Sequence, residues 1–221
     1  MSSQRATSTG LPPAVERLFD ADDRRRLGEL RRDLHRHPEL AFEEHRTADR
    51  LTAELERLEP VELHRVAGTG LAARLRGRER SATPVAVRGD IDALPIDEQT
   101  GLDFASQIPG IMHACGHDVH AAWAVGAALL LRRRPARGDV WVILQPAEEI
   151  AQGAPAIIES GVLDDVGAIF AGHVDRRFAV GEAVVQAGPL AAAADSFEVV
   201  LVGQGGHGAR PHLVRDPVVA A

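Results

Sequence analysis

Short apolar runs of strand character alternate with segments of helical character along most of this chain of 221 residues. Helical patterns occur in four segments, residues 21–36, 42–58, 119–131 and 153–160. Strand-like runs occupy residues 61–66, 71–75, 85–87, 140–144 and 166–171, and the last of them is expected to be a buried strand. This alternation favours an α/β fold in three layers, with a sheet that carries helices on both faces.

Changes in composition divide the chain into three regions. Residues 1–12 are small and polar, which predicts a disordered tail. The alternating pattern predicts one large domain over residues 13–188. Near Pro189 the pattern changes to an alanine-rich stretch and then to an alternating run at residues 197–202, which predicts a strand. We therefore expect the start of a second, smaller domain over residues 189–221.

Charge and apolar content exclude several classes of partner. The net charge is −7, which argues against binding to nucleic acid through its phosphates. The amino-terminal residues lack the apolar core of a secretory signal, and the longest apolar run, residues 121–131, is too short to cross a bilayer. A single cysteine cannot form an internal disulfide, which fits a reducing compartment. We expect a cytoplasmic protein without nucleic-acid or membrane partners.

Two aspartates, Asp90 and Asp92, follow the strand-like run at residues 85–87. In an extended segment, residues two apart point to the same side, so one carboxylate could serve a metal while the other supports a neighbouring ligand. Aspartate is also an ordinary turn residue after a strand. The pair alone leaves both interpretations open.

The densest group of potential metal ligands is His-Ala-Cys-Gly-His-Asp-Val-His at residues 113–120. Cys115 and His117 lie two residues apart, so a thiolate and an imidazole can reach one borderline-soft ion, and Gly116 lets the backbone bend between them. Asp118 is placed to cap the following helix. A buried free cysteine beside a hydrogen-bonded histidine is the alternative.

Two further clusters also follow strand-like runs. Glu148 and Glu149 end the segment Gln-Pro-Ala-Glu-Glu, and His173 follows the run at residues 166–171. Adjacent acids resist ionising when buried, and a divalent metal removes that cost, so one glutamate could bind metal while its neighbour takes a proton from water. Taken separately, the acids could be a solvated pair and the histidine structural. Because open α/β sheets place their sites after strands, the four clusters together predict a metal site.

Five segments share their order and spacing with one known family. They are Leu-His-Arg-His-Pro-Glu-Leu (34–40), Arg-Gly-Asp-Ile-Asp-Ala-Leu-Pro (88–95), His-Ala-Cys-Gly-His-Asp (113–118), Gln-Pro-Ala-Glu-Glu (145–149) and Gly-Gly-His-Gly-Ala-Arg-Pro-His (205–212). From about residue 25 to its last residue, the chain resembles the metal-dependent amidohydrolases that include hippurate hydrolase, auxin-conjugate hydrolases and bacterial N-acyl-amino-acid amidohydrolases. The resemblance implies a zinc-exopeptidase-like catalytic domain, followed by the start of an α+β dimerisation or lid domain.

The resemblance also implies a set of metal ligands. Cys115, His117, Glu149 and His173 would bind two divalent ions, with Mn, Zn, Co and Ni as candidates. In more distant relatives a histidine ligand occupies the position of Asp90, so the ligand status of this aspartate stays open.

The implied activity is hydrolysis of an amide bond in N-acyl amino acids or related small conjugates. Glu148 would be the general base that takes a proton from water, and Asp92 would orient a metal-ligating group. His207, in the smaller domain, would reach the active site of a partner in a homodimer and polarise the scissile carbonyl. The expected substrate is therefore a small N-acyl amino acid or a peptide-like molecule.

The chain departs from the family in two places. It stops at Ala221, soon after Asp216 and Pro217, which predict the N-cap and first position of a helix. Later segments of the family include a final histidine ligand, so a truncated or degenerate homologue without activity is an alternative. In addition, Asp-Arg-Arg at residues 175–177 stands where family members often carry an aromatic residue and a proline.

Two other functions remain as alternatives. Cys115 could be the nucleophile of a cysteine hydrolase, with a nearby histidine as base. Residues 203–208 satisfy the pattern Gly-x-Gly-x-x-Gly after a strand-like run, as in a dinucleotide-binding loop. Pro211, however, interrupts the helix that such a loop requires.

Overall fold

The computed structural model describes residues 17–185, 187–189 and 197–221, so the predicted tail at residues 1–12 lies outside the described part. The chain divides into two compact units, and the boundary between them falls between Ala183 and Val184. The domain limits expected from composition, with a change near Pro189, stay a prediction.

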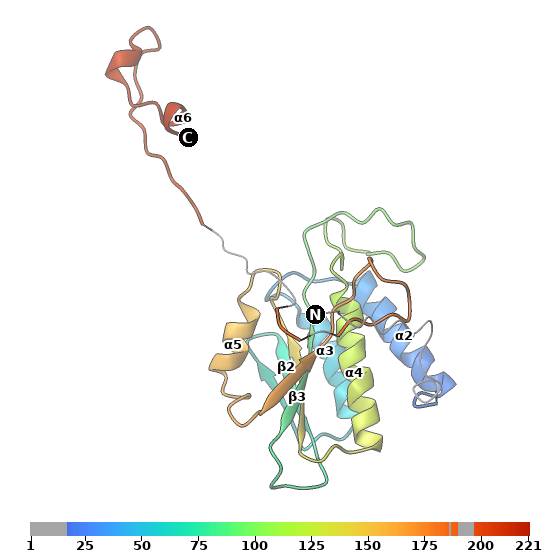
Figure 1. Ribbon diagram of the computed structural model, residues 1–221. Coiled ribbons are helices and arrows are strands. Elements are labelled where there is room, and N and C mark those ends of the chain that lie inside the picture. Colours follow the sequence, from blue (N-terminus) through green and yellow to red (C-terminus); the bar gives the residue numbers. More distant parts are fainter. Residues whose placement is uncertain (1–16, 186, 190–196) are drawn as a thin grey trace. The chain divides into compact units, whose positions relative to one another are not determined.

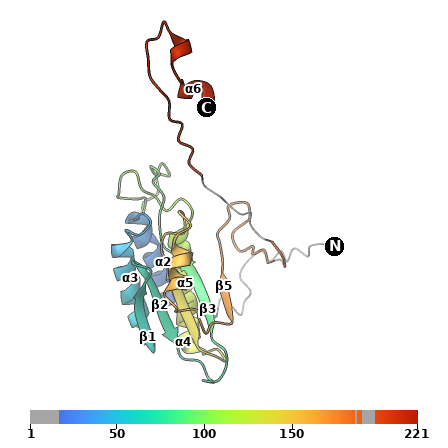
Figure 2. The ribbon, with the colours of Figure 1, turned by 90° about the vertical axis from the view of Figure 1, so that its left-hand side faces the viewer.

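The larger unit is built on a sheet in which the described strands follow the order β1-β2-β4-β3-β5. The strands are β1 (Glu62–Val66), β2 (Gly70–Leu75), β3 (Val85–Asp90), β4 (Val140–Gln145) and β5 (Ala168–Ala171). β3 runs parallel to both of its neighbours, β4 and β5, whereas β2 is antiparallel to β1 and β4. Figure 2 shows β1 and β5 at opposite edges of the sheet.

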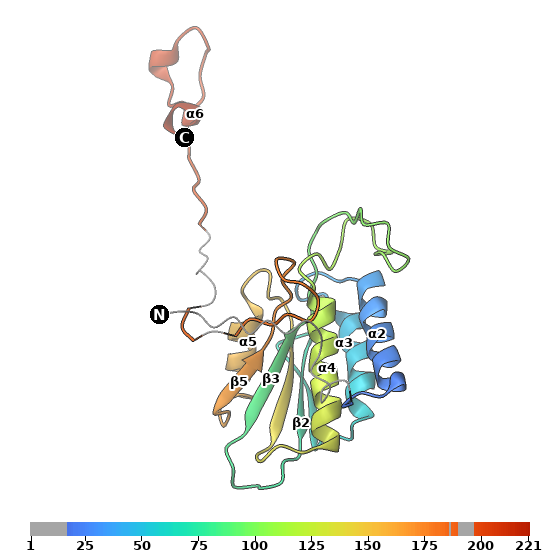
Figure 3. The ribbon, with the colours of Figure 1, turned by 45° about the vertical axis from the view of Figure 1, so that its right-hand side comes forward.

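Helices cover both faces of the sheet (Figures 1 and 3). α2 (Ala21–Arg36), α3 (His45–Glu56) and α4 (His117–Arg133) lie on one face, where Leu30, Leu51 and Val142 belong to the main core cluster. α5 (Gly153–Glu159) lies on the other face, where Ile157 packs with Trp141 and Ile143. The predicted three-layer α/β fold is confirmed.

The helices α2 and α4 differ in how their first turns are capped. Asp20, not singled out from the sequence, caps α2 in a reciprocal capping box with Asp23. The prediction that Asp118 caps α4 is wrong. The N-cap is Gly116, in the left-handed region at φ 87°, and Asp118 lies in the first turn with its side chain bonded to His35 instead. A buried imidazole within reach competes for the carboxylate that would otherwise cap the helix.

β5 was expected to be a buried strand, and this is wrong. The exposed fractions of Ile169 and Phe170 are 52% and 60%. The physical reason is that β5 is the last strand in the sheet order, and among the described strands it pairs only with β3.

The smaller unit contains a short 3-10 helix, η1 (Pro211–Leu213), and a short helix, α6 (Pro217–Ala220). Asp216 caps α6 by accepting a hydrogen bond from Val218 N, as predicted. The prediction of a strand at residues 197–202 is wrong. A strand requires a hydrogen-bonded neighbour, and this segment pairs with no strand among the described residues. The loop at residues 203–208 therefore lacks both the strand before it and the α-helix after it that dinucleotide binding requires.

In the larger unit, α4 approaches β3 closely at Gly89. A Cβ atom added there would lie 2.6 Å from the backbone oxygen of His120, so Gly89→Ala must displace the helix or the strand. We expect this variant to lower the free energy of unfolding by about 1–3 kcal/mol.

Gly28 in α2 provides a matched control, because a Cβ atom there meets nothing within 4 Å. We expect Gly28→Ala to raise stability by about 0.5–1 kcal/mol, since alanine is the better helix former. Denaturant unfolding of both variants checks the pair. Equal stability of Gly89→Ala and the unsubstituted protein would contradict the close packing of α4 on β3.

Candidate metal centre

The predicted ligands of the larger unit gather at one edge of the sheet, beyond the carboxyl ends of the parallel strands. Asp90 is the last residue of β3, the Glu148–Glu149 pair follows β4, and His173 follows β5. Parallel strands that end at the same edge bring such residues together although they are far apart in sequence. α4 begins at this edge with His117.

His117 lies at the centre of the cluster and is fully buried. Its Nδ1 atom is 3.1 Å from Asp92 Oδ1, so a proton on Nδ1 is donated to this carboxylate. Its Nε2 atom has no hydrogen-bond partner among the residues that the structure describes, although carboxylate oxygens of Asp90, Glu148 and Glu149 each lie 3.7 Å away. A buried imidazole nitrogen that faces several carboxylate oxygens without a hydrogen bond is the arrangement that a metal cation would complete.

Cys115 and His173 also lie close to His117. The Cys115 Sγ atom is 3.4 Å from His173 Nε2, and one potential ligand atom from each of Cys115, His117 and His173 lies within 4.8 Å of the others. His117, Glu148 and Glu149 form a second group under the same limit. The two groups share His117, and together they offer sulfur, nitrogen and oxygen ligands, a set that suits first-row divalent ions.

Asp92 connects two of these ligands. While Oδ1 accepts from His117, Oδ2 accepts a hydrogen bond of 2.9 Å from the backbone N–H of Glu149. Burial raises the pKa of Asp92, but the hydrogen bonds from His117 and Glu149 outweigh this effect and hold the pKa below its usual value. One ionised carboxylate thus orients both the imidazole and the turn that carries the glutamates.

Both carboxylate oxygens of Asp90 interact with neighbouring side chains. Its Oδ1 lies 2.6 Å from His120 Nδ1, and its Oδ2 pairs with Arg88. Burial raises the pKa of Asp90, but the bond to His120 and the charge of Arg88 lower it further, to about 2. Asp90 also groups with His117 and His120 as a third set of potential ligands. Its ligand status stays open.

His120 was not assigned a role from the sequence. Its Nε2 accepts a 2.9 Å hydrogen bond from Val174 N, and its ring meets that of His173 edge-on at 4.5 Å between centroids. The signal in the sequence was its position three residues after His117, which places both rings on one face of α4. His120 therefore links Asp90 to the segment that carries His173.

Electrostatics oppose a nucleophilic role for Cys115. Burial raises the pKa of this thiol to about 12, and the nearby carboxylates of Glu149, Glu148 and Asp90 raise it in the same direction. Burial and the neighbouring carboxylates of Glu148 and Asp92 also raise the pKa of Glu149. A cysteine nucleophile needs a lowered pKa. A divalent cation instead reverses these effects and favours the thiolate as a ligand.

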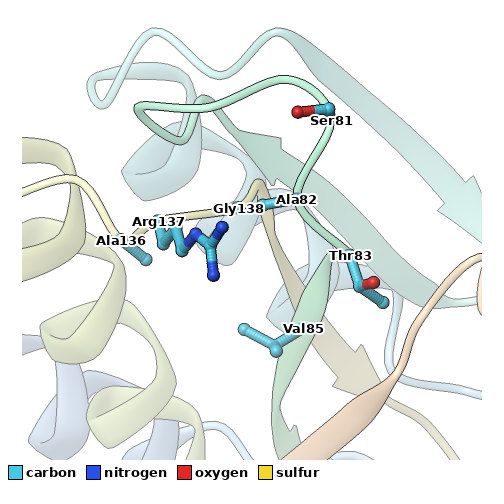
Figure 4. Close-up of a pocket in the computed structure, with 7 residues that line it drawn as sticks. All are labelled: Ser81, Ala82, Thr83, Val85, Ala136, Arg137 and Gly138. Atoms are coloured by element: carbon cyan, nitrogen blue, oxygen red, sulfur yellow. The ribbon is translucent and has the colours of Figure 1, made fainter.

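His207 belongs to the unit that begins at Val184, and its role stays a prediction. A cavity of about 440 Å³ is lined by residues from Ser81 to Val85 and from Ala136 to Gly138 (Figure 4). This cavity lies at the amino ends of β3 and β4, away from the predicted ligands.

Comparison with known proteins relates this chain to one family of hydrolases. The model of peptidase family M20/M25/M40 matches residues 86–220. An N-acetylcysteine deacetylase of Bacillus subtilis is 49% identical over 89% of this chain and 52% of its own length. An N-acyl-L-amino acid amidohydrolase of Geobacillus stearothermophilus is 40% identical over 85% of this chain and 51% of its own length.

A solved structure extends the likeness to the fold. A dinuclear metal-binding peptidase from the M20 family of Bacillus subtilis superposes with a TM-score of 0.68 at 49% identity, over 71% of this chain and 44% of that one. The chain spans about half the length of the two curated relatives named above.

Proposed function

Because the chain belongs to peptidase family M20/M25/M40, as its resemblance to amidohydrolases implied, we propose that it carries the metal-binding part of a hydrolase for amide bonds in N-acyl amino acids or related small conjugates. The observation that carries this proposal is the buried, unpartnered Nε2 of His117, which faces three carboxylates and lies beside Cys115 and His173. Glu149 Oε1 is a second buried atom without a partner in the described residues.

Cys115, His117, Glu149 and His173 are the residues that would hold two divalent ions, with Mn, Zn, Co and Ni as the candidates. When bound, such ions lower the pKa of a water molecule towards about 7 and polarise a carbonyl group. Asp92 keeps the proton of His117 on Nδ1, which leaves Nε2 free as a ligand atom.

Glu148 is the proposed general base. Its side chain is 41% exposed, against 20% for Glu149, so it is the glutamate that solvent reaches more readily. Glu148 takes a proton from the attacking water as the new C–O bond forms. It then returns this proton to the nitrogen of the leaving amine as the C–N bond breaks. The proton is thereby conserved between the attacking water and the product amine.

We propose a small N-acyl amino acid or peptide-like substrate, a homodimer in which His207 polarises the scissile carbonyl, and a cytoplasmic location. We also propose that residues 13–188 form the catalytic domain and that residues 189–221 begin a dimerisation or lid domain. No helix among the described residues combines the length and the apolar character that a membrane span requires.

Chelation and reconstitution test the proposed activity. We expect treatment with EDTA to abolish hydrolysis of a panel of N-acetyl amino acids, and added Mn²⁺, Zn²⁺, Co²⁺ or Ni²⁺ to restore it. Amine release is the measurement. Activity that survives EDTA but is lost on alkylation of Cys115 would instead indicate a cysteine hydrolase. A reconstituted protein that binds metal and hydrolyses none of the panel would support the degenerate alternative.

A further inference from the structure

We propose that the buried carboxyl group of Glu44 is a positioning residue for the turn that carries Glu148 and Glu149. This inference rests on the proposed metal centre, which contains Glu149. The hydrogen bonds of this carboxyl group within the described residues go to Thr69 and Ala147, not to either glutamate. The carboxyl group acts through the backbone of Ala147, the residue that precedes them.

Glu44 is fully buried, an uncommon environment for a glutamate side chain. Both of its carboxylate oxygens accept hydrogen bonds. Oε1 accepts from Ala147 N at 2.9 Å, and Oε2 accepts from the hydroxyl group of Thr69, which is 2% exposed. One side chain thus joins the start of α3, the segment before β2 and the turn after β4.

Helix capping does not explain why a glutamate occupies position 44. Glu44 is the N-cap of α3 but makes no side-chain capping bond. Glu39 performs this task, because its carboxylate oxygens accept from Arg46 N at 3.0 Å and from Thr47 N at 2.7 Å. The carboxyl group of Glu44 is therefore used for its contacts with Thr69 and Ala147.

Ala147 has a backbone conformation that needs support. It is fully buried and has φ +50°, in the left-handed region that L-residues other than glycine rarely adopt. Its carbonyl oxygen accepts from Gly153 N at 3.0 Å, which closes the turn from inside. Its N–H is held from outside the turn, by Glu44. The direction of the chain at Ala147 sets where Glu148 and Glu149 point.

The turn is also tightly packed around Pro146. A Cβ atom added at Gly153 would lie 1.6 Å from the oxygen of Pro146, and one added at Gly70 would lie 2.7 Å from its Cδ. A shift of the turn therefore disturbs these close contacts and changes where the following residues point. When the acceptor of the Ala147 N–H is lost, this N–H is left buried without a partner, and the chain must shift to satisfy it.

Titration with Co²⁺ tests the role of Glu44. Binding is measured by the thiolate-to-cobalt absorption band that appears when the thiolate of Cys115 binds the ion. We expect Glu44→Met to weaken Co²⁺ binding by about tenfold or more, as loss of an outer contact at a metal site does. Glu43→Met is the matched control, since Glu43 is exposed and adjacent to Glu44. The Co²⁺ affinity of this variant should equal that of the unsubstituted protein. Glu44→Gln should rescue binding, because its amide oxygen can accept from Ala147 while the hydroxyl of Thr69 turns to accept from its NH₂ group.

Circular dichroism and thermal unfolding of each variant separate positioning from stability. A Glu44→Met variant that melts at a lower temperature but binds Co²⁺ as tightly as the unsubstituted protein would overturn the proposal. If Glu44→Met does not fold, Thr69→Val removes one of the two hydrogen bonds and should weaken Co²⁺ binding less severely; unchanged binding would overturn the proposal. An unsubstituted protein without the thiolate-to-cobalt absorption would contradict the metal centre itself.

Discussion

Glu148→Gln is expected to lower kcat by about 10²–10⁴-fold while the protein keeps its metal ions, because glutamine has the shape of glutamate but cannot accept the proton of water. Glu148 is more exposed than Glu149 and approaches the unpartnered Nε2 of His117 to 3.7 Å. Its greater exposure to solvent suits the proposed role as the acceptor of a proton from water. Steady-state kinetics with metal analysis of the same sample measure the effect.

The control for this variant is Glu159→Gln, at the exposed end of α5. It makes the same chemical change away from the centre and should leave kcat unaltered. A Glu148→Gln protein with full metal content and unreduced turnover would show that another group takes the proton. A Glu148→Gln protein without metal would instead assign Glu148 to the ligands.

The second large effect is expected from Asp92→Asn, which should weaken metal binding by about 10–100-fold. Asparagine has only one oxygen, whereas Asp92 accepts from both His117 Nδ1 and Glu149 N. In either orientation of the amide, an NH₂ group faces one of these two donors. If it faces His117, the proton of the imidazole moves to Nε2 and blocks the ligand atom.

Competition between the protein and a chelator for Mn²⁺ measures this loss. Asp103→Asn is the matched control, because Asp103 is exposed in the loop between β3 and α4 and should have no influence on Mn²⁺ affinity. Equal affinity of the Asp92→Asn and unsubstituted proteins would mean that Asp92 does not orient the ligands.

The larger unit could be predicted well because its information is local. Helical spacing of Leu30 and Leu34 and the apolar run that forms β4 are visible within a few residues, and the structure has a helix and a strand there. The gathering of ligands also follows from a local rule, since each cluster comes directly after a strand or at the start of α4. The roles of the individual residues in the proposed metal centre remain predictions.

What the sequence could not show depends on contacts between distant segments. Glu44 lies 103 positions from Ala147, and His35 lies 83 from Asp118, so no local pattern reveals either bond. The capping prediction for Asp118 was wrong for this reason. The exposure of β5 likewise depends on its place at the end of the sheet order, which no local pattern in residues 166–171 reveals.

Anomalous diffraction at the zinc absorption edge, from crystals grown with Zn²⁺, tests the metal centre most directly. We expect a strong peak about 2.0–2.3 Å from His117 Nε2 and Cys115 Sγ, with Glu149 and His173 as the other ligands of the centre. A strongest peak bound elsewhere, with His117 Nε2 in contact with no metal ion, would contradict it.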